Sequence, residues 1–461
     1  MTLIGLLAFI FILGAAVVLH EFGHFIVAKM LGIRVETFSV GFGKRLWGRR
    51  WGTTDYRLSL IPLGGYVKLG GDESNAGLEE GGDGEEIPAK ERFDLRPRWQ
   101  KVAVGVAGPV MNVLTAIAVP LMLAMIIGVP MTPAPVVKSV RQGSAAEAAG
   151  IRPGDRIVSF NGREDREWEK ISNDAMLSPE QPLPLVVERE GQRVPLTVSP
   201  SKELIEGEAI GRLGILPDYG DVPVIVSSVS EGSPAAEGGL KLGDQILKVG
   251  DETVTSSEQV ARYIEEHKEG AVRFDLKRNG ETVQVMAGER RLPNGKLGFG
   301  PAELYPIQRV GLGDALSYSV SHNIEILRLT GMALGQVFSG QRSVRNTFSG
   351  PIGIAEASKK AVEDGGLEGG LRIFGFLSLN LGIFNLLPIP VLDGGMIFMV
   401  LLEGMLAWVG LKLSMTVRER IQQVGFVFLL LLMGFVIIND VTKIASRFTG
   451  SNDPPAATQQ K

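Results

Sequence analysis

The stretch VVLHEFGHFI, residues 17–26, places two histidines and a glutamate inside an apolar segment. Residues four positions apart share one face of a helix, so His20 and His24 can reach a single metal ion while Glu21 stands beside them as a base. Residues 1–19 carry no charge, whereas a secretory signal peptide begins with a positive region. We therefore expect a retained membrane helix with a metal site. The plainer alternative is two buried histidines satisfied by hydrogen bonds within a helix bundle.

Four apolar segments approach or exceed the roughly 20 residues that a helix needs to cross a bilayer. We assign these spans to residues 1–33, 101–130, 371–411 and 412–448. The third contains NLLPIPVLDGG, residues 385–395, in which the prolines remove helical hydrogen bonds and the paired glycines permit unusual backbone angles. This span should therefore be broken. A catalytic zinc site usually has three protein ligands, and Asp393, stranded at this break, is the candidate for the third.

Composition narrows the class of protein. The chain has 461 residues, a net charge of −4 and no cysteine, which excludes disulfides, thiolate nucleophiles and Cys-ligated zinc and gives no reason to expect nucleic acid. Residues 29–57 carry seven basic and two acidic side chains, so the loop at 34–100 should be cytoplasmic. The N-terminus, the long segment that begins near residue 138 and the C-terminus should then lie outside. Residues 75–86 are expected to be a flexible acidic link, and 449–461 a disordered tail.

The exterior segment contains an internal repeat. Residues 136–161 align without gaps to 225–250, at an offset of 89 residues and with ten identities in 26 positions. The copies, assigned to 131–218 and 219–305, resemble bacterial, circularly permuted PDZ domains, with Gly-Asp turns at 154–155 and 243–244. PDZ domains bind extended peptides by adding a strand to a sheet edge. The expected groove residues are Leu213, Gly214, Ile215, Leu297, Gly298 and Phe299. The alternative is that both copies are spacers whose grooves stay empty.

The combination of HExxH in the first span with NxxPxPxLDG in a late span resembles the site-2 protease family of intramembrane zinc metalloproteases. GFG at 41–43, GPVMN at 108–112 and SGPIGI at 349–354 also resemble that family, whereas Met396 stands where many members have histidine. The resemblance implies one Zn²⁺ per chain, held by His20, His24 and Asp393, with Glu21 as general base and acid. It also implies substrate handling by Asn380 and Asn385, which could instead form inter-helix hydrogen bonds.

Residues 56–71, YRLSLIPLGGYVKLGG, alternate apolar side chains around Pro62 and Gly64-Gly65, which predicts a β-hairpin over about 55–71. This hairpin resembles the family's membrane-re-entrant β-loop, and an edge strand there could pair with an unwound substrate. The residues expected to contact substrate are Leu60, Ile61, Gly64, Gly65 and Tyr66. The alternative is an ordinary cytoplasmic hairpin. Residues 306–370 should form an exterior, membrane-associated amphipathic segment that, with the PDZ pair, gates access of substrates with large exterior domains.

The predicted fold class is a multi-pass α-helical membrane protein with four transmembrane helices, two inserted α+β PDZ domains and a membrane-associated β-hairpin. The resemblance implies an endopeptidase of the bacterial inner membrane, with its zinc site towards the cytoplasmic side and its PDZ domains in the periplasm. Its implied substrates are single-pass membrane proteins already trimmed by another protease, such as an anti-sigma factor, and remnant signal peptides. Two alternatives remain. One is a metal-ion carrier, because His and Asp in membrane spans also mark ion paths. The other is a non-catalytic PDZ receptor for exterior peptides.

Overall fold

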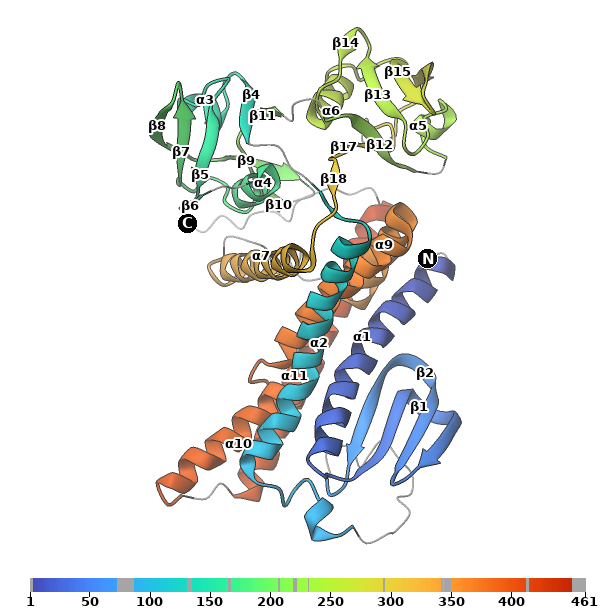
Figure 1. Ribbon diagram of the computed structural model, residues 1–461, viewed down its shortest axis with the longest axis vertical. Helices are drawn as coiled ribbons and strands as arrows, with labels where there is room; N and C mark the ends of the chain where they lie inside the picture. The colour runs from blue at the N-terminus through green and yellow to red at the C-terminus, as the bar shows by residue number, and fades with distance from the viewer. Residues whose placement is uncertain are drawn as a thin grey trace. The chain divides into compact units, whose positions relative to one another are not determined.

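The computed structural model describes residues 3–72, 87–130, 135–164, 167–205, 208–218, 222–230, 232–292, 295–340, 343, 350–411 and 414–449 (Figure 1). The acidic link predicted at 75–86 and the tail from residue 450 onwards lie outside these residues. The chain divides into two compact units. The first holds the long apolar helices and one β-sheet, and the second holds the segment between residues 127 and 309 together with the end of helix α7.

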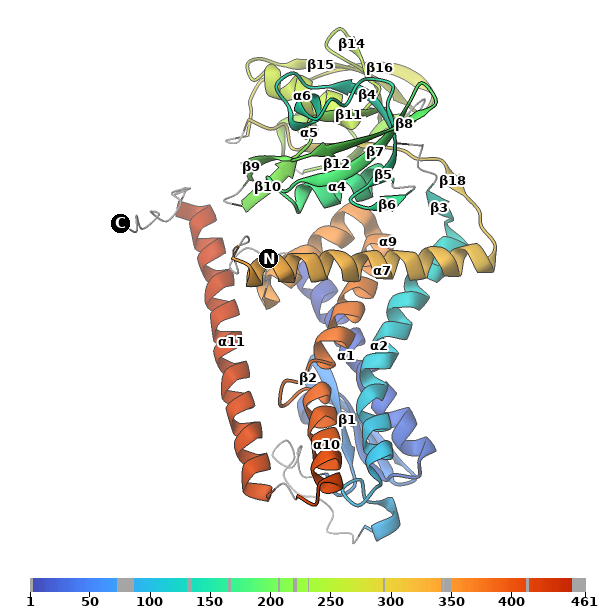
Figure 2. The same cartoon turned by 90° about the vertical axis from the view of Figure 1, so that its left-hand side faces the viewer.

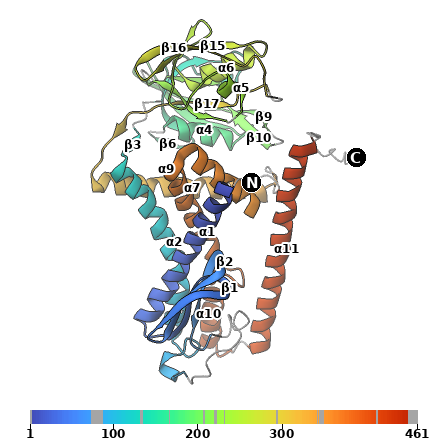
Figure 3. The ribbon, with the colours of Figure 1, turned by 90° about the vertical axis from the view of Figure 1, so that its right-hand side faces the viewer.

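Four of the described helices are long and apolar enough to cross a membrane, as the sequence predicts. They are α1 (Leu3–Met30), α2 (Arg98–Ile126), α9 (Pro351–Asn385) and α11 (Met415–Thr449). A 3-10 turn, η2 (Ala89–Glu91), precedes α2. The helices α1, α2 and α9 pack against one another, and Figure 3 shows α1 beside α2. Because each of these helices contains a long, predominantly apolar stretch, lipid rather than water is the solvent that suits that stretch.

The third predicted span is broken, but its bounds differ from those expected. Helix α9 runs through residue 370, where we placed a boundary, and a kink with φ 56° at Gly366 divides it. The chain leaves the helix after Asn385 and re-enters one at α10 (Asp393–Trp408). The predicted boundary at residue 370 was wrong because residues 351–366 carry mixed polarity, so nothing in the sequence indicated that they continue the helix of the apolar segment that follows.

A sheet of two long, bent strands packs beside α1 (Figures 1 and 3). In β1 (Val35–Trp51), residues 37–40 pair on one side with the start of β2 (Thr54–Leu69) and on the other with its end. The hairpin predicted with its turn at Gly64-Gly65 is therefore wrong: β2 passes through these glycines, and the tight turn lies at residues 52–53. Alternation of apolar residues identifies a strand but not its partner, and Gly64, at φ 134°, lets the strand bend.

Helix α7 (Leu312–Phe338) buries small and polar residues rather than apolar ones. Ala315, Ser319 and Asn323 form the buried stripe; the Ser319 hydroxyl donates to the Ile117 carbonyl at 2.6 Å, and the Asn323 amide donates to that of Ala116 at 3.0 Å. The exposed surface includes the apolar Leu312 and Ile324 together with polar side chains such as Asp314. Apolar side chains on the exposed surface are what a helix in contact with lipid needs, and the assignment of this segment to the membrane surface stays a prediction.

The second unit contains two six-stranded sheets in which equivalent strands follow the same order. The first sheet has the order β11-β4-β5-β7-β8, with β6 on β5, and the second has β17-β12-β13-β15-β16, with β14 on β13. The elements of the first are β4 (Val136–Val140), α3 (Ala145–Ala148), β5 (Arg156–Phe160), β6 (Arg163–Glu164), α4 (Trp168–Met176), β7 (Leu183–Arg189), β8 (Gln192–Val198) and β11 (Ile215–Asp218), with an extra hairpin of β9 (Ser201–Ile205) and β10 (Glu208–Arg212). Those of the second are β12 (Val224–Val229), α5 (Pro234–Glu237), β13 (Gln245–Val249), β14 (Glu252–Thr253), α6 (Ser257–Glu266), β15 (Val272–Arg278), β16 (Glu281–Ala287) and β17 (Phe299–Glu303).

One buried ion pair recurs in both sheets. Asp155, at the first Gly-Asp turn, accepts two hydrogen bonds from Arg189, each 2.8 Å long. Asp244, at the second, accepts two from Arg278, at 2.7 and 2.6 Å. The two aspartates are 89 positions apart in the sequence, and so are the two arginines, which is the offset of the repeat. The Gly-Asp turns therefore have the same structural role in each copy, because the aspartate binds its turn to the arginine at the end of β7 or β15. The assignment of the two copies as PDZ domains stays a prediction.

The two ends of the inserted segment meet in a short ladder. Strand β3 (Val129–Pro130), which follows α2, pairs antiparallel with β18 (Ile307–Gln308), which precedes α7. A side chain at Gly128 would collide with Ile307, so the glycine allows the ends to approach closely. The two short strands that flank residues 131–306 thus pair with each other and hold the ends of the insertion together.

Candidate metal centre

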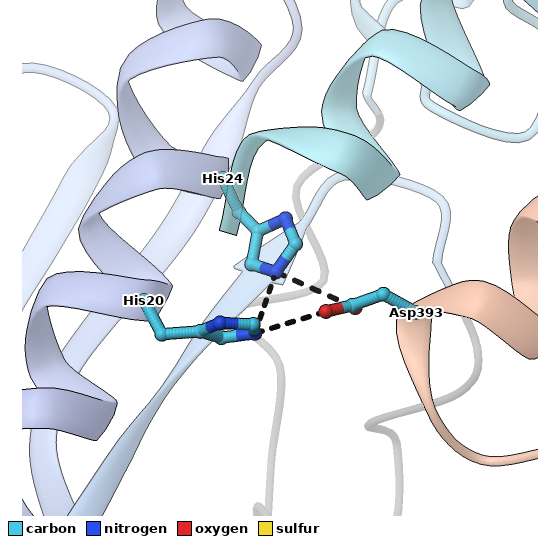
Figure 4. Close-up of side chains that lie close together, drawn as sticks. All are labelled: His20, His24 and Asp393. Carbon is cyan, nitrogen blue, oxygen red and sulfur yellow. Dashed lines mark hydrogen bonds and ion pairs between the residues drawn. The ribbon is translucent and has the colours of Figure 1, made fainter. Parts of the chain in front are cut away.

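His20, His24 and Asp393 converge although 373 positions separate His20 from Asp393 in the sequence (Figure 4). The Nε2 atoms of the two histidines lie 3.3 Å apart. Asp393 places Oδ2 at 2.9 Å from Nε2 of His20 and Oδ1 at 3.4 Å from Nε2 of His24. One ligand atom from each residue lies within 4.8 Å of the others. The three side chains therefore point at one common position.

The spacing of these atoms suits a small divalent cation. Tetrahedral zinc, with bonds of about 2.0–2.1 Å, separates its ligand atoms by about 3.3 Å. The distance between the two imidazole nitrogens and that from His24 to Asp393 are 3.3 and 3.4 Å. Oδ2 of Asp393 is buried and faces Nε2 of His20 at 2.9 Å, so a carboxylate oxygen and a ring nitrogen lie where a cation could take both as ligands. The donor set of two imidazoles and one carboxylate fits zinc.

Glycines bring α1 and α2 close enough to build the site. A Cβ atom on Gly23 would lie 2.3 Å from the Ala107 carbonyl oxygen, so only glycine permits this approach. A Cβ atom on Gly108 would lie 2.3 Å from Nε2 of His24 and 2.8 Å from Cε1 of His20. Gly108 therefore leaves the space that the two imidazole rings occupy, which gives the GPVMN motif a structural reason.

The break between α9 and α10 positions Asp393. The chain turns back over residues 386–392, and Val391 adopts φ 82°, a strained value for a β-branched residue. A Cβ atom on Gly394 would lie 2.3 Å from the carbonyl oxygens of both Leu386 and Leu387. The paired glycines after the aspartate thus let the first turn of α10 pack on the preceding loop, which points Asp393 towards α1.

Each histidine has a partner on α2 for its second ring nitrogen. Nδ1 of His24 donates to the Val104 carbonyl oxygen at 2.7 Å, since a carbonyl can only accept. Nδ1 of His20 lies 3.2 Å from Nδ2 of Asn112, which is fully buried. The sequence analysis gave Asn112 no role. The available signal was its spacing of four residues from Gly108, which places both on the face of α2 that meets the histidines.

Glu21 lies beside the three converging residues and is tied to β2. Its Oε2 accepts a hydrogen bond from the Val67 backbone amide at 3.1 Å. The end of β2 is an edge of the described sheet, because residues 65–69 pair with β1 on one side only. The carboxylate next to the metal position is thus oriented by the outer edge of a β-strand.

The residues predicted to contact substrate are placed differently from one another. Asn385 lies at the site, with Nδ2 at 3.3 Å from Nε2 of His20, whereas Asn380 donates to the Phe376 carbonyl of its own helix at 2.8 Å. Gly64, Gly65 and Tyr66 are buried, and the two glycines lie against α1. Leu60 and Ile61 are exposed by 58% and 48%.

Met396, the residue that departs from the family pattern, lies on α10 and packs against α2, which runs beside α10 (Figure 2). A Cβ atom on Gly105 would lie 2.5 Å from Cε of Met396, which shows how closely α10 approaches that helix. The remaining histidines are exposed. His267 stacks on Tyr263 with ring centroids 4.0 Å apart, and His322 stacks on Tyr318 at 6.0 Å.

The predicted peptide grooves of the second unit lie at sheet edges. Strands β11 and β17 each pair with one described strand only, and the loops before them hold Gly214 and Gly298 at φ 76° and 79°. The carbonyls of Leu213 and Leu297 accept hydrogen bonds from the Ala146 and Ala235 amides, each 2.9 Å long. Ile215 and Phe299 begin the two strands. The edges are geometrically suited to strand addition, and peptide binding stays a prediction.

Comparison with known proteins places the chain in a family. It matches the model of peptidase family M50 over residues 8–432. It is 31% identical over 469 residues to the regulator of sigma-E protease RseP of Salmonella typhimurium, an alignment that covers 95% of this chain and 99% of the relative. Identities of 32% over 460 residues to the regulator of sigma E protease of Haemophilus influenzae, and 31% over 469 to a zinc metalloprotease of Vibrio cholerae, each cover 95% of this chain and 98% of the relative. The chain therefore belongs to peptidase family M50, the site-2 protease family, and is a zinc metalloprotease with membrane-spanning helices.

Proposed function

We propose that this protein is an intramembrane endopeptidase that cleaves peptide bonds within the transmembrane segments of single-pass membrane proteins. The observation that carries the proposal is that His20 and His24, on a helix long and apolar enough to span a membrane, converge with Asp393, which begins the apolar helix α10 after the break that follows another such helix. Ionisable groups at this depth cost about 2.5–3.5 kcal/mol each on insertion scales, so a cluster of them needs a use. Peptide hydrolysis by a zinc protease is that use.

In this proposal His20, His24 and Asp393 hold the zinc ion. Bound zinc polarises a carbonyl and lowers the pKa of water to about 7. Glu21 takes a proton from the attacking water and returns it to the leaving amine. The hydrogen bond from the Val67 amide, 3.1 Å long, keeps its carboxylate turned towards the site during both steps. Asn385, whose amide lies 3.3 Å from His20, stands where it can donate to the oxygen that gains charge on the substrate carbonyl.

The edge of β2 offers a way to present an unwound helix. A transmembrane substrate keeps its carbonyls hydrogen-bonded internally, so it must open before cleavage. Residues 65–69 pair with β1 along one edge, and Glu21 lies on the side of the other edge. We assign this edge to strand addition by the unwound substrate, with Tyr66, Gly64 and Gly65 beside it and Leu60 and Ile61 exposed towards lipid or substrate.

Orientation and substrate follow from charge and from the relatives. Because the loop at 29–57 is basic, we assign the C-terminal end of α1, and with it the metal centre, to the cytoplasmic side of the inner membrane, and the second unit to the periplasm. The relatives named regulators of sigma-E protease point to a membrane-bound anti-sigma factor, already trimmed by another protease, as the substrate class. Remnant signal peptides are a further substrate class, and the exterior unit acts as a gate against untrimmed proteins.

The test uses the full chain in detergent or vesicles with a model transmembrane peptide. The natural protein should cleave the peptide, lose activity on removal of zinc and regain it on zinc addition. Glu21→Gln should lower the cleavage rate by a factor of about 10² to 10⁴ while zinc content stays unchanged. A metal-ion carrier would show the opposite pattern: it would move zinc across vesicles equally well with the Glu21 variant and cleave no peptide. Cleavage by Glu21→Gln at the natural rate would refute the proposed mechanism.

A further inference from the structure

We infer that Asn112 is a positioning residue for the metal centre: its side-chain oxygen accepts a hydrogen bond from Nδ1–H of His20, which fixes that imidazole with the lone pair of Nε2 directed at the zinc. The inference deepens the proposed function and rests on its zinc site. It assigns a role to a residue that carries no charge and contacts no metal.

The argument begins with the chemistry of a metal-binding imidazole. A histidine binds a metal through a nitrogen that carries no proton, so the proton must sit on the other nitrogen. That second nitrogen then needs an acceptor, and the acceptor sets the tautomer and the ring orientation. His24 already has one, because the Val104 carbonyl lies 2.7 Å from its Nδ1. His20 must have an equivalent partner at Nδ1.

Asn112 is the group that meets this requirement. Its amide lies 3.2 Å from Nδ1 of His20, and the residue is fully buried, so water cannot replace it. If the amide nitrogen of Asn112 faced the ring, it would donate to Nδ1 of His20, and the ring proton of that histidine would have to lie on Nε2. That nitrogen would then point a proton at Asp393, 2.9 Å away, and could not bind metal.

Rotation of the amide by 180° resolves the conflict. Oxygen and nitrogen of an asparagine amide are nearly indistinguishable in shape, and their placement is decided by the surrounding hydrogen bonds. Oδ1 of Asn112 is a buried atom without a partner among the described residues, and rotation brings it to Nδ1–H of His20. Either orientation leaves one amide atom without a partner, so the hydrogen bonds of the amide do not decide between the two orientations. The requirement that Nε2 of His20 keep a lone pair for zinc selects the orientation with Oδ1 towards Nδ1–H.

One face of α2 carries the groups that support both histidines. Val104, Gly108 and Asn112 follow one another at intervals of four residues and therefore lie along one face. Val104 orients His24, Gly108 leaves room for both rings, and Asn112 orients His20. One helix face thus supports both imidazoles, whereas the ligands themselves come from α1 and α10.

The experiment compares zinc affinity rather than activity. The full-length protein and its variants are purified in detergent and equilibrated with zinc buffered by a chelator, and bound zinc is measured by atomic absorption. Asn112→Leu removes both amide atoms at similar volume and should weaken zinc binding by about 10- to 100-fold. Asn112→Asp keeps an acceptor but no amide donor, so it should bind zinc at least as tightly as the natural chain. Should the leucine variant fail to fold, Asn112→Ala makes the same comparison without added bulk.

Asn323→Leu is the matched control, because Asn323 is also a buried asparagine that contacts α2, through the Ala116 carbonyl, and it should leave zinc affinity unchanged. Thermal unfolding of the zinc-free proteins shows that each variant is folded. If Asn112→Asp loses zinc as Asn112→Leu does, the amide acts as a donor and the inference is overturned. If both retain natural affinity, Asn112 has no positioning role. A natural chain that binds no more zinc than His24→Ala refutes the zinc site, and with it both proposals.

Discussion

A single methyl group at Gly108 should destroy the metal centre while leaving the fold intact. The Cβ atom of Gly108→Ala would lie 2.3 Å from Nε2 of His24, whereas ordinary contacts begin at 3.4 Å. Helix and ring must therefore separate by about 1.1 Å, several times the ±0.2 Å within which metal–ligand distances are held. Loss of one ligand's geometry should weaken zinc binding by at least about 100-fold, or about 2.8 kcal/mol.

The cost to folding should be smaller. Overpacking of one methyl group typically costs about 1–3 kcal/mol, which a membrane helix bundle of this size can absorb. The assay is a chelator competition for zinc on the purified protein, with thermal unfolding of the zinc-free form beside it. Gly434→Ala is the matched control, because a Cβ atom there meets nothing within 4 Å and the residue also lies in an apolar helix. Natural zinc affinity in Gly108→Ala would show that the two helices are not packed as closely as the argument requires.

Two further predictions concern stability. Asp440 of α11 accepts hydrogen bonds from the amides of Gly350, Ile352 and Gly353 at 3.0, 3.0 and 3.1 Å and so caps α9; Asp440→Ala should cost about 1–2 kcal/mol, seen as a lower Tm, whereas the exposed Asp364→Ala should not change it. In the second unit, burial opposes ionisation of Asp155 and Asp244, but Arg189 and Arg278 hold the pKa of each carboxyl below its usual value. A carboxyl whose pKa is lower in the folded than in the unfolded protein, where it is about 3.9, stabilises the fold when the pH lies above that unfolded pKa. The free energy of unfolding of this unit should therefore be independent of pH from about 5 to 8 and should fall as the pH drops below about 4. Asp244→Asn should remove part of that pH dependence and lower the free energy of unfolding by about 2 kcal/mol at neutral pH. The control Glu252→Gln, in an exposed ion pair with Arg262, should cost less than about 0.5 kcal/mol. If Asp244→Asn lost stability at low pH as the natural protein does, the role of the Asp244–Arg278 pair would be contradicted.

Sequence alone predicted those features that depend on local spacing. Two histidines four residues apart on an apolar helix must share a face, and an aspartate beside Pro and Gly in an uncharged run must sit at a break; the structure brings these three residues together. Features that depend on a distant partner could not be predicted. The strand at 54–69 alternates correctly, but its pairing with both edges of residues 37–40 follows from tertiary packing. Asn112 carries no charge, so only its contact with His20 gives it meaning.

The position of the third carboxylate has a consequence for biogenesis. Ribosomes make α1, with its two imidazoles, long before Asp393, which appears only after the whole inserted segment has been translated. We expect the nascent chain to reside in the bilayer as an inert precursor until α10 arrives. Translation order would thus restrain a destructive enzyme during assembly, and a ribosome-stalled chain that ends before residue 393 should be harmless to neighbouring helices.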